Sequence, residues 1–178
     1  LAADIRENLR KICTLEEQRR IEVTHLDAWV NQFLRETGFS AQIGYDDVID
    51  PLWDRATLLA NNELPYEVSF YKEEWNRIVI AQEALTLEEY VKATRNGRGT
   101  RLDRKKRIQV WKVFENYQNL MKENQIRDIN TAMYESTKLL QAAGRKPRYV
   151  SIIIDEGQDF SDNAYRLIRA LAGEEHPN

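Results

Sequence analysis

Apolar residues recur every three or four positions along most of the chain, a spacing that predicts helices. The longest predicted helix spans residues 103–122. Its apolar stripe consists of Ile108, Trp111, Phe114, Tyr117 and Met121. Such a stripe is typical of a helix packed against a hydrophobic core. We therefore expect these side chains to be core residues and not a ligand-binding surface.

Start and stop signals predict the remaining helices. They are expected at residues 2–12, 26–36, 51–60, 70–82, 87–94, 129–140 and 162–172. Their N-caps, whose side chains accept hydrogen bonds from free backbone N–H groups, are expected to be Thr24, Asp50, Ser69, Thr86 and Ser161. Glu89 completes a capping box with Thr86. Pro51 stands directly after Asp50, which favours it as the first helical residue.

Two segments are predicted to be β-strands, residues 21–23 and residues 149–154. The second is apolar at nearly every position, which is typical of a strand covered on both faces in a parallel sheet. More than a hundred mainly helical residues separate the two segments, and they cannot form such a sheet alone. The expected fold class is α/β, mainly helical, with a partial parallel sheet completed by sequence outside these residues.

Composition narrows the class of protein. A single cysteine, Cys13, fits a reducing compartment, and we expect the cytoplasm. The two histidines and the cysteine show no metal-ligand spacing. No apolar run approaches the roughly 20 residues that a membrane span needs, so no membrane partner is expected. Because the sequence opens as if inside a helix, without Met, we interpret it as a piece of a longer protein.

The net charge of −3 hides a strong asymmetry along the chain. Residues 46–90 carry mostly acids, whereas residues 91–107 carry eight bases and one acid. Four of the bases are candidate contacts to nucleic-acid phosphates: Arg95, Arg98, Arg101 and Lys105. Two alternatives stay open: the bases form an ordinary solvated helix face, or they pair with the acidic segment and hold the helices together.

The apolar run 149–154 ends in two adjacent carboxylates, Asp155 and Glu156. Ligands of open parallel sheets bind beyond the carboxyl ends of the strands. Nucleotide hydrolysis needs one carboxylate for Mg²⁺ and a second to orient or deprotonate the attacking water. Gln158 could sense the terminal phosphate. The same pair of acids also occurs at ordinary strand-to-helix turns.

The complete string IIIDEGQDFS resembles the Walker B motif of UvrD/Rep-type superfamily 1 DNA helicases. LAADIRENL resembles the helix just after the second DNA-contacting motif of that family, and IEVTHLDAWVNQFLRE resembles the next motif. LTLEEYVKATRNGRGTRL and RIQVWKVFENYQNLM resemble its inserted helical subdomain. The resemblance implies a P-loop NTPase (RecA-like) motor domain. It divides the chain into part of the first motor domain (1–39), the inserted helical subdomain (40–146), and a further part of the motor domain with the Walker B strand (147–178).

Residue by residue, the resemblance implies that Asp155 serves Mg²⁺, that Glu156 activates water, and that Gln158 contacts the terminal phosphate of ATP. Thr24 and His25 would approach single-stranded DNA. The implied cofactors are ATP and Mg²⁺. The implied partners are single-stranded DNA or a duplex junction, and the rest of the helicase chain.

One part of the family's ATP site is missing from this sequence. A P-loop requires G-x-x-x-x-G-K-[ST], and no two of the seven glycines are five positions apart. We therefore expect the full-length protein to be an ATP-dependent DNA helicase or translocase, and this chain alone to be inactive. The alternatives are a non-catalytic nucleic-acid-binding module and a P-loop ATPase used in signalling or defence.

Overall fold

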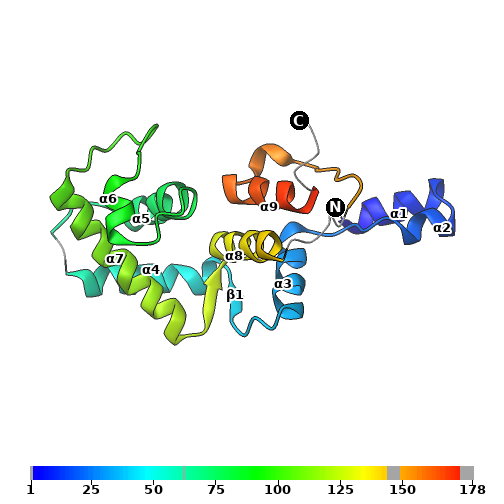
Figure 1. Cartoon of the computed structure of the whole chain (residues 1–178). Coiled ribbons are helices and arrows are strands. Elements are labelled where there is room, and N and C mark those ends of the chain that lie inside the picture. The colour runs from blue at the N-terminus through cyan, green and yellow to red at the C-terminus, as the bar shows by residue number, and fades with distance from the viewer. Residues whose placement is uncertain (1, 62, 144–148, 173–178) are drawn as a thin grey trace. The chain divides into compact units, whose positions relative to one another are not determined.

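A computed structural model describes residues 2–61, 63–143 and 149–172. The chain divides into two compact units, Leu1–Phe39 and Ser40–Asn178 (Figure 1). The predicted division at residue 146 stays a prediction.

The first unit contains α1 (Ala2–Ile12), α2 (Leu15–Arg19) and α3 (Leu26–Glu36). The bounds of α1 and α3 are those expected from the sequence. The buried face of α3 is apolar, and on it Trp29 stacks on Phe33 with ring centroids 4.9 Å apart. The sequence analysis missed α2.

Thr24 does not cap α3, contrary to expectation. The N-cap position is His25, whose side chain makes no capping hydrogen bond. The Thr24 hydroxyl instead donates to the His25 carbonyl oxygen over 3.3 Å. At the other end of the helix, Gly38 adopts a positive φ of 80°, which a glycine tolerates without strain.

Neither predicted strand forms. Residues 21–25 and 149–154 have no regular secondary structure, and Val150 and Ile153 are 92% and 95% exposed. A strand is stabilised by hydrogen bonds to a neighbouring strand, and no described segment pairs with either of these two. The prediction of these two strands was wrong. The described residues do contain a small parallel sheet, which is compatible with a partial motor domain, but other segments form it.

The observed sheet lies elsewhere, in the second unit. β1 (Gln42–Gly44) pairs in parallel with β2 (Ile126–Asp128). A Cβ at Gly44 would lie 2.8 Å from Cγ2 of Ile126 and 3.1 Å from Cδ1 of Ile49. The glycine therefore permits close packing where β1 enters the core.

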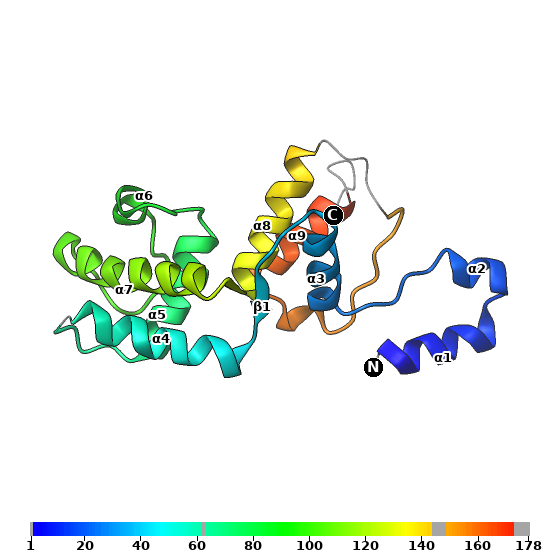
Figure 2. The ribbon, with the colours of Figure 1, turned by 90° about the horizontal axis from the view of Figure 1, so that it is seen from below.

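The remaining elements of the second unit are α4 (Asp46–Ala60), α5 (Val68–Glu74), the π-helix η1 (Trp75–Ile80), α6 (Leu87–Lys92), α7 (Arg104–Glu123), α8 (Ile129–Ala142), the 3₁₀ turn η2 (Gly157–Asp159) and α9 (Asp162–Ala172). Helices α4 and α7 pack side by side, and so do α8 and α9 (Figures 1 and 2). The described part of the chain is thus mostly helical.

Aromatic side chains form the centre of the core beneath α4 and α7. Trp53 stacks on Tyr117 with centroids 3.7 Å apart, and Trp75 meets Phe114 edge to face at 5.4 Å. Such pairs add stability beyond the burial of their apolar area. The predicted stripe on α7 is confirmed for its four later members, but Ile108 is 39% exposed.

The caps fall partly where expected. Thr86 forms the predicted capping box, and Ser161 caps α9. Asp50 and Ser69 are not caps: α4 already begins at Asp46, so Asp50 lies inside it and pairs with Lys72, and Glu67 is the N-cap of α5. The helix predicted over 70–82 divides into α5 and the π-helix.

Candidate functional site

The predicted catalytic residues lie in an exposed turn just before α9. Glu156 has a positive φ of 54°, and the turn η2 follows it directly. This conformation brings Gln158 back toward Glu156, so that the Gln158 amide donates a hydrogen bond to the Glu156 carboxylate. Asp155 is also exposed. The two residues assigned to the attacking water and the terminal phosphate therefore touch each other.

Residues from α8 and α9 support this turn. The Tyr165 hydroxyl donates to the Gly157 carbonyl oxygen over 2.6 Å. Ser161 accepts a hydrogen bond from the Ala164 N–H and donates one to Oδ1 of Asn130, 3.0 Å away on α8. The sequence analysis identified Ser161 as a cap but missed Tyr165 and Asn130, whose roles depend on the tertiary fold.

The other predicted DNA contacts near the N-terminus, Thr24 and His25, lie next to each other at the start of α3, and both are exposed. Nearby, burial raises the pKa of Asp27, and the charge of His25 opposes that increase. An exposed hydroxyl and imidazole at a helix start are accessible to a ligand. Their contact with DNA stays a prediction.

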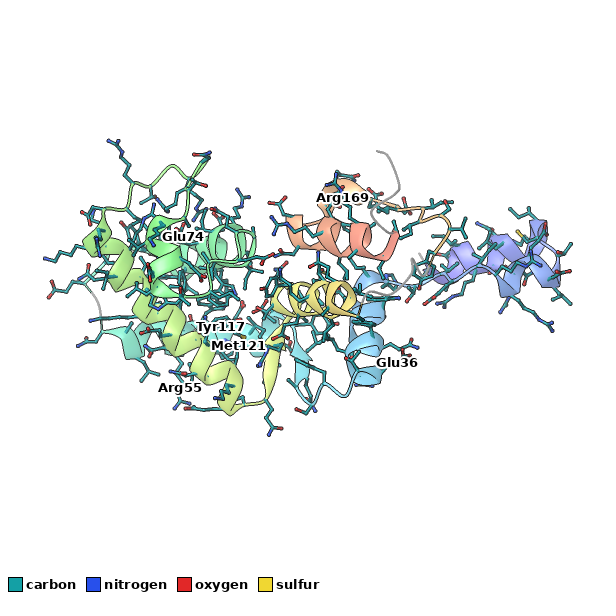
Figure 3. All side chains as sticks on the ribbon, viewed as in Figure 1. Glu36, Arg55, Glu74, Tyr117, Met121 and Arg169 are labelled. Carbon is teal, nitrogen blue, oxygen red and sulfur yellow. The ribbon has the colours of Figure 1, made fainter. Side chains whose placement is uncertain are left out.

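The basic segment divides into buried and exposed residues. Arg95 and Arg98, here called the inner arginines, have side chains only 7% and 9% exposed, and both pair with Glu74. The side chain of Glu74, which is labelled in Figure 3, is fully buried. Arg95 binds both carboxylate oxygens of Glu74, at 2.5 and 2.9 Å. Arg98 binds Glu74 at 3.1 Å and also pairs with Glu73.

This arrangement corrects the prediction that the inner arginines contact phosphates. Their guanidinium groups are occupied by carboxylates from the acidic segment, which is the alternative in which the bases hold the helices together. Burial opposes the charge of Arg95, but its hydrogen bond to Glu74 and the charge of Glu74 outweigh this effect and raise its pKa. Burial, together with the charge of Glu74, also raises the pKa of Tyr90, whose hydroxyl donates to Glu74 over 3.0 Å.

Of the other six bases in residues 91–107, two bind acceptor oxygens and four form a separate exposed surface. Lys92 pairs with Glu88 on the surface of α6. Arg107 donates hydrogen bonds to three carbonyl oxygens at the end of α6: Tyr90 (2.7 Å), Val91 (3.1 Å) and Ala93 (2.8 Å). Four further bases are also exposed and are here called the outer basic surface: Arg101, Arg104, Lys105 and Lys106. Two of the predicted phosphate contacts, Arg101 and Lys105, belong to it.

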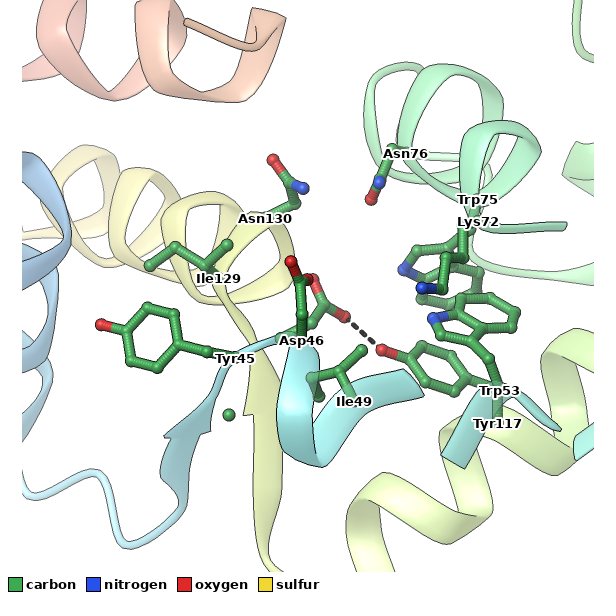
Figure 4. Close-up of a pocket in the computed structure, with 12 residues that line it drawn as sticks. Tyr45, Asp46, Ile49, Trp53, Lys72, Trp75, Asn76, Tyr117, Ile129 and Asn130 are labelled. Atoms are coloured by element: carbon green, nitrogen blue, oxygen red, sulfur yellow. Dashed lines mark hydrogen bonds between the residues drawn. The ribbon is translucent and has the colours of Figure 1, made fainter. Parts of the chain in front are cut away.

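A cavity of about 260 Å³ opens between the sheet and the aromatic core (Figure 4). Its polar wall includes Asp128, which accepts hydrogen bonds from the Tyr117 hydroxyl (3.0 Å) and from the N–H and hydroxyl groups of Thr131 (2.9 and 2.7 Å). Burial and the charge of Asp128 raise the pKa of Tyr117. These groups already satisfy one another, which favours a structural role. The sequence analysis did not identify this cavity.

The fold and these sites can be set beside known proteins. A family model described as the UvrD/REP helicase N-terminal domain matches residues 1–177. The chain belongs to this family. UvrD-type helicases act on DNA and use ATP and Mg²⁺, so the family supports a DNA helicase as the parent protein. Neither the search of curated proteins nor the search of solved structures found a match.

Two further properties of this UvrD/REP-family chain bear on its ligands. Within residues 2–61, 63–143 and 149–172, no helix is long and apolar enough to cross a membrane. Over the same residues, no three His, Cys, Asp or Glu side chains gather into a site that could hold a metal by themselves.

Proposed function

We propose that this chain supplies the Walker B acids and part of the DNA-binding surface of an ATP-dependent DNA helicase or translocase, and that it acts in the cytoplasm. The observation that carries the proposal is the string at residues 152–161 in a chain of the UvrD/REP family, with Glu156 and Gln158 hydrogen-bonded to each other. The single free cysteine, Cys13, is consistent with a reducing compartment.

The residues present fit the Mg²⁺-binding part of an ATP site. Proteins hold Mg²⁺ through one or two carboxylates together with waters and substrate phosphates, and the exposed carboxylate of Asp155 is suited to this role. When bound, Mg²⁺ neutralises charge that develops on the phosphates. No P-loop sequence is present, so the cradle for the phosphates must come from outside these 178 residues.

In this proposal Glu156 accepts the proton of the attacking water, and Gln158 orients that water or the terminal phosphate. The hydrogen bond between them fixes the direction of the carboxylate before substrate arrives. The bond from Tyr165 to the Gly157 carbonyl oxygen holds the turn to α9, so the distance between the two side chains depends on packing in the second unit.

The test of this role is Glu156→Gln in the full-length protein. Turnover of ATP should fall by about 10²–10⁴-fold, the usual contribution of a positioned acid or base, while ATP binding is retained because Asp155 is unchanged. Asp162→Asn removes another exposed carboxylate close by and should leave turnover within about twofold. Glu156→Gln turnover within a few-fold of wild type would show that Glu156 is not the base.

The proposed DNA surface consists of exposed bases just before α7 and in its first turn. The double variant Arg101→Ala, Lys105→Ala should weaken binding similarly for unrelated sequences. Each lost phosphate contact lowers the salt slope by roughly 0.7–0.9, so two should lower it by about 1.4–1.8. Arg55→Ala, Lys122→Ala removes the same charge elsewhere; Lys122 lies about 25 Å along α7 from Lys105 at 1.5 Å per residue. Equal behaviour of the two double variants would contradict this surface.

The two alternatives predict different results. A non-catalytic nucleic-acid-binding module would bind DNA without any ATP turnover for Glu156→Gln to abolish. A P-loop ATPase with a signalling or defence role would hydrolyse ATP without stimulation by single-stranded DNA. Measuring ATP turnover of the full-length protein with and without single-stranded DNA therefore separates all three functions.

A further inference from the structure

We propose that Glu74 is a positioning residue for DNA binding: by holding the inner arginines it fixes the loop that presents the outer basic surface. This inference rests on the proposed DNA-binding function. The buried cluster and the exposed cluster would then have different tasks, although both belong to one basic stretch of sequence.

A continuous series of contacts joins Glu74 to the outer basic surface. Glu74 binds Arg95 through both carboxylate oxygens. Nη1 of Arg95 then donates to the carbonyl oxygen of Thr100, the residue directly before Arg101. Arg95 therefore connects the buried carboxylate of α5 to the backbone at the first residue of the outer surface.

Arg98 holds the middle of the same loop. It binds Glu74 at 3.1 Å, pairs with Glu73, and lies over the Phe70 ring at 5.4 Å from its centroid. Between the inner arginines stands Gly97, with a φ of 75°. This residue lets the chain turn so that both arginines point inward. With both held inside, the loop has one favoured path to α7.

The outer basic surface needs such support because its charges repel one another. Three of its four bases occupy the first turn of α7, which contains no acid. The N-terminus of a helix carries partial positive charge, so cations there are unfavourable. Asp103, the N-cap, is the nearest acid in the sequence. Without the anchor at Glu74, we expect the loop before α7 to spread into many conformations.

The charge of Glu74 and its proposed positioning of the loop predict opposite effects of Glu74→Gln on DNA affinity. Glu74→Gln removes a negative charge near a DNA-binding surface, so electrostatic attraction alone would make DNA bind more tightly. If Glu74 positions the loop, its loss should weaken binding by about two- to tenfold, the cost of immobilising one flexible side chain on association. The sign of the change therefore distinguishes the two explanations.

The experiment uses the full-length protein and a fluorescein-labelled forked duplex of mixed sequence, with anisotropy recorded over a series of salt concentrations. Glu74→Gln should bind more weakly and with a lower salt slope, while ATP turnover without DNA is unchanged. Glu73→Gln is the matched control, because it removes an exposed carboxylate bonded to Arg98. It should bind as wild type or slightly more tightly.

A second variant tests the inference even if Glu74→Gln does not fold. Arg95→Lys keeps the charge but replaces the three nitrogens that bind Glu74 and the Thr100 carbonyl oxygen by a single one, so it should also weaken binding. Wild-type or tighter binding by a folded Glu74→Gln or by Arg95→Lys would overturn the inference, as would equal weakening by Glu73→Gln. The proposed DNA surface itself fails separately, if Arg101→Ala, Lys105→Ala has no effect.

Discussion

The hydrogen bond between Tyr117 and Asp128 joins α7 to the residue that caps α8. Asp128 is buried and accepts three hydrogen bonds, two from Thr131 and one from the Tyr117 hydroxyl. Tyr117→Phe removes one donor and leaves the ring, which stacks on Trp53, in place. We expect the second unit to lose stability without a change of fold.

The loss of stability expected for Tyr117→Phe can be estimated from the charge of the acceptor and from its access to water. A hydrogen bond to a charged group contributes about 1.5–3 kcal/mol. Tyr117 and Asp128 both line the 260 Å³ cavity, so a water molecule can take the place of the lost hydroxyl. We therefore expect the lower value, a decrease of about 1.5 kcal/mol in the free energy of unfolding, and a fall in Tm of about 3–6 °C for a chain of this size.

Urea denaturation followed by circular dichroism measures the change. Tyr134→Phe is the matched control, because Tyr134 is a half-buried tyrosine on α8 whose hydroxyl has no hydrogen bond in the described structure. It should cost less than about 0.5 kcal/mol, as for most substitutions away from specific contacts. A loss for Tyr117→Phe no larger than for this control would refute the importance of the Asp128 network.

Three other outcomes are expected. Thr86→Ala removes the capping box of α6 and should lower the free energy of unfolding by about 0.5–2 kcal/mol in urea denaturation; no measurable loss would contradict this role. The hydrogen bond and the charge of Arg98 hold the pKa of the Glu73 carboxyl below its ordinary value of 4.5. The stability that this ion pair gives to the folded chain is therefore present above pH 4.5 and is lost as the pH falls through the lowered pKa. Thermal melts of Glu73→Gln should accordingly show a shallower loss of stability below pH 4.5 than wild type. The 178-residue chain mixed with Mg-ATP should release no phosphate above buffer, and turnover that Glu156→Gln abolishes would contradict that expectation.

The helices could be predicted because their signals are local. The capping box at Thr86 acts over three residues, and Ser161 caps α9 over the same distance. Spacing along the sequence is enough to find such contacts. Pro51 shows the limit of these signals, because a proline that suits the first position of a helix lies inside α4. The helix begins at Asp46 instead, and its first turn carries the acids Asp46 and Asp47, which also suit a helix start.

The strands and the individual partners in the buried ion pairs could not be predicted, because the paired segments are distant in sequence. Glu74 meets Arg95 across 21 positions, and a count of charges does not tell which of them the fold encloses. One signal was available: Glu74 lies on the same helical face as Tyr71 and Ile78, both buried. An acid within an apolar stripe indicates a buried partner.

The parallel pairing of β1 with β2 has a consequence for the order in which the chain folds. The two strands lie about 80 residues apart in sequence, and closing so long a loop costs about 1.8 kcal/mol more in chain entropy than closing one of ten residues. Helices α4 to α7 form from nearer contacts and should assemble first, which shortens the effective loop. Gly44→Ala, which crowds Ile126, should then speed unfolding and leave the folding rate nearly unchanged.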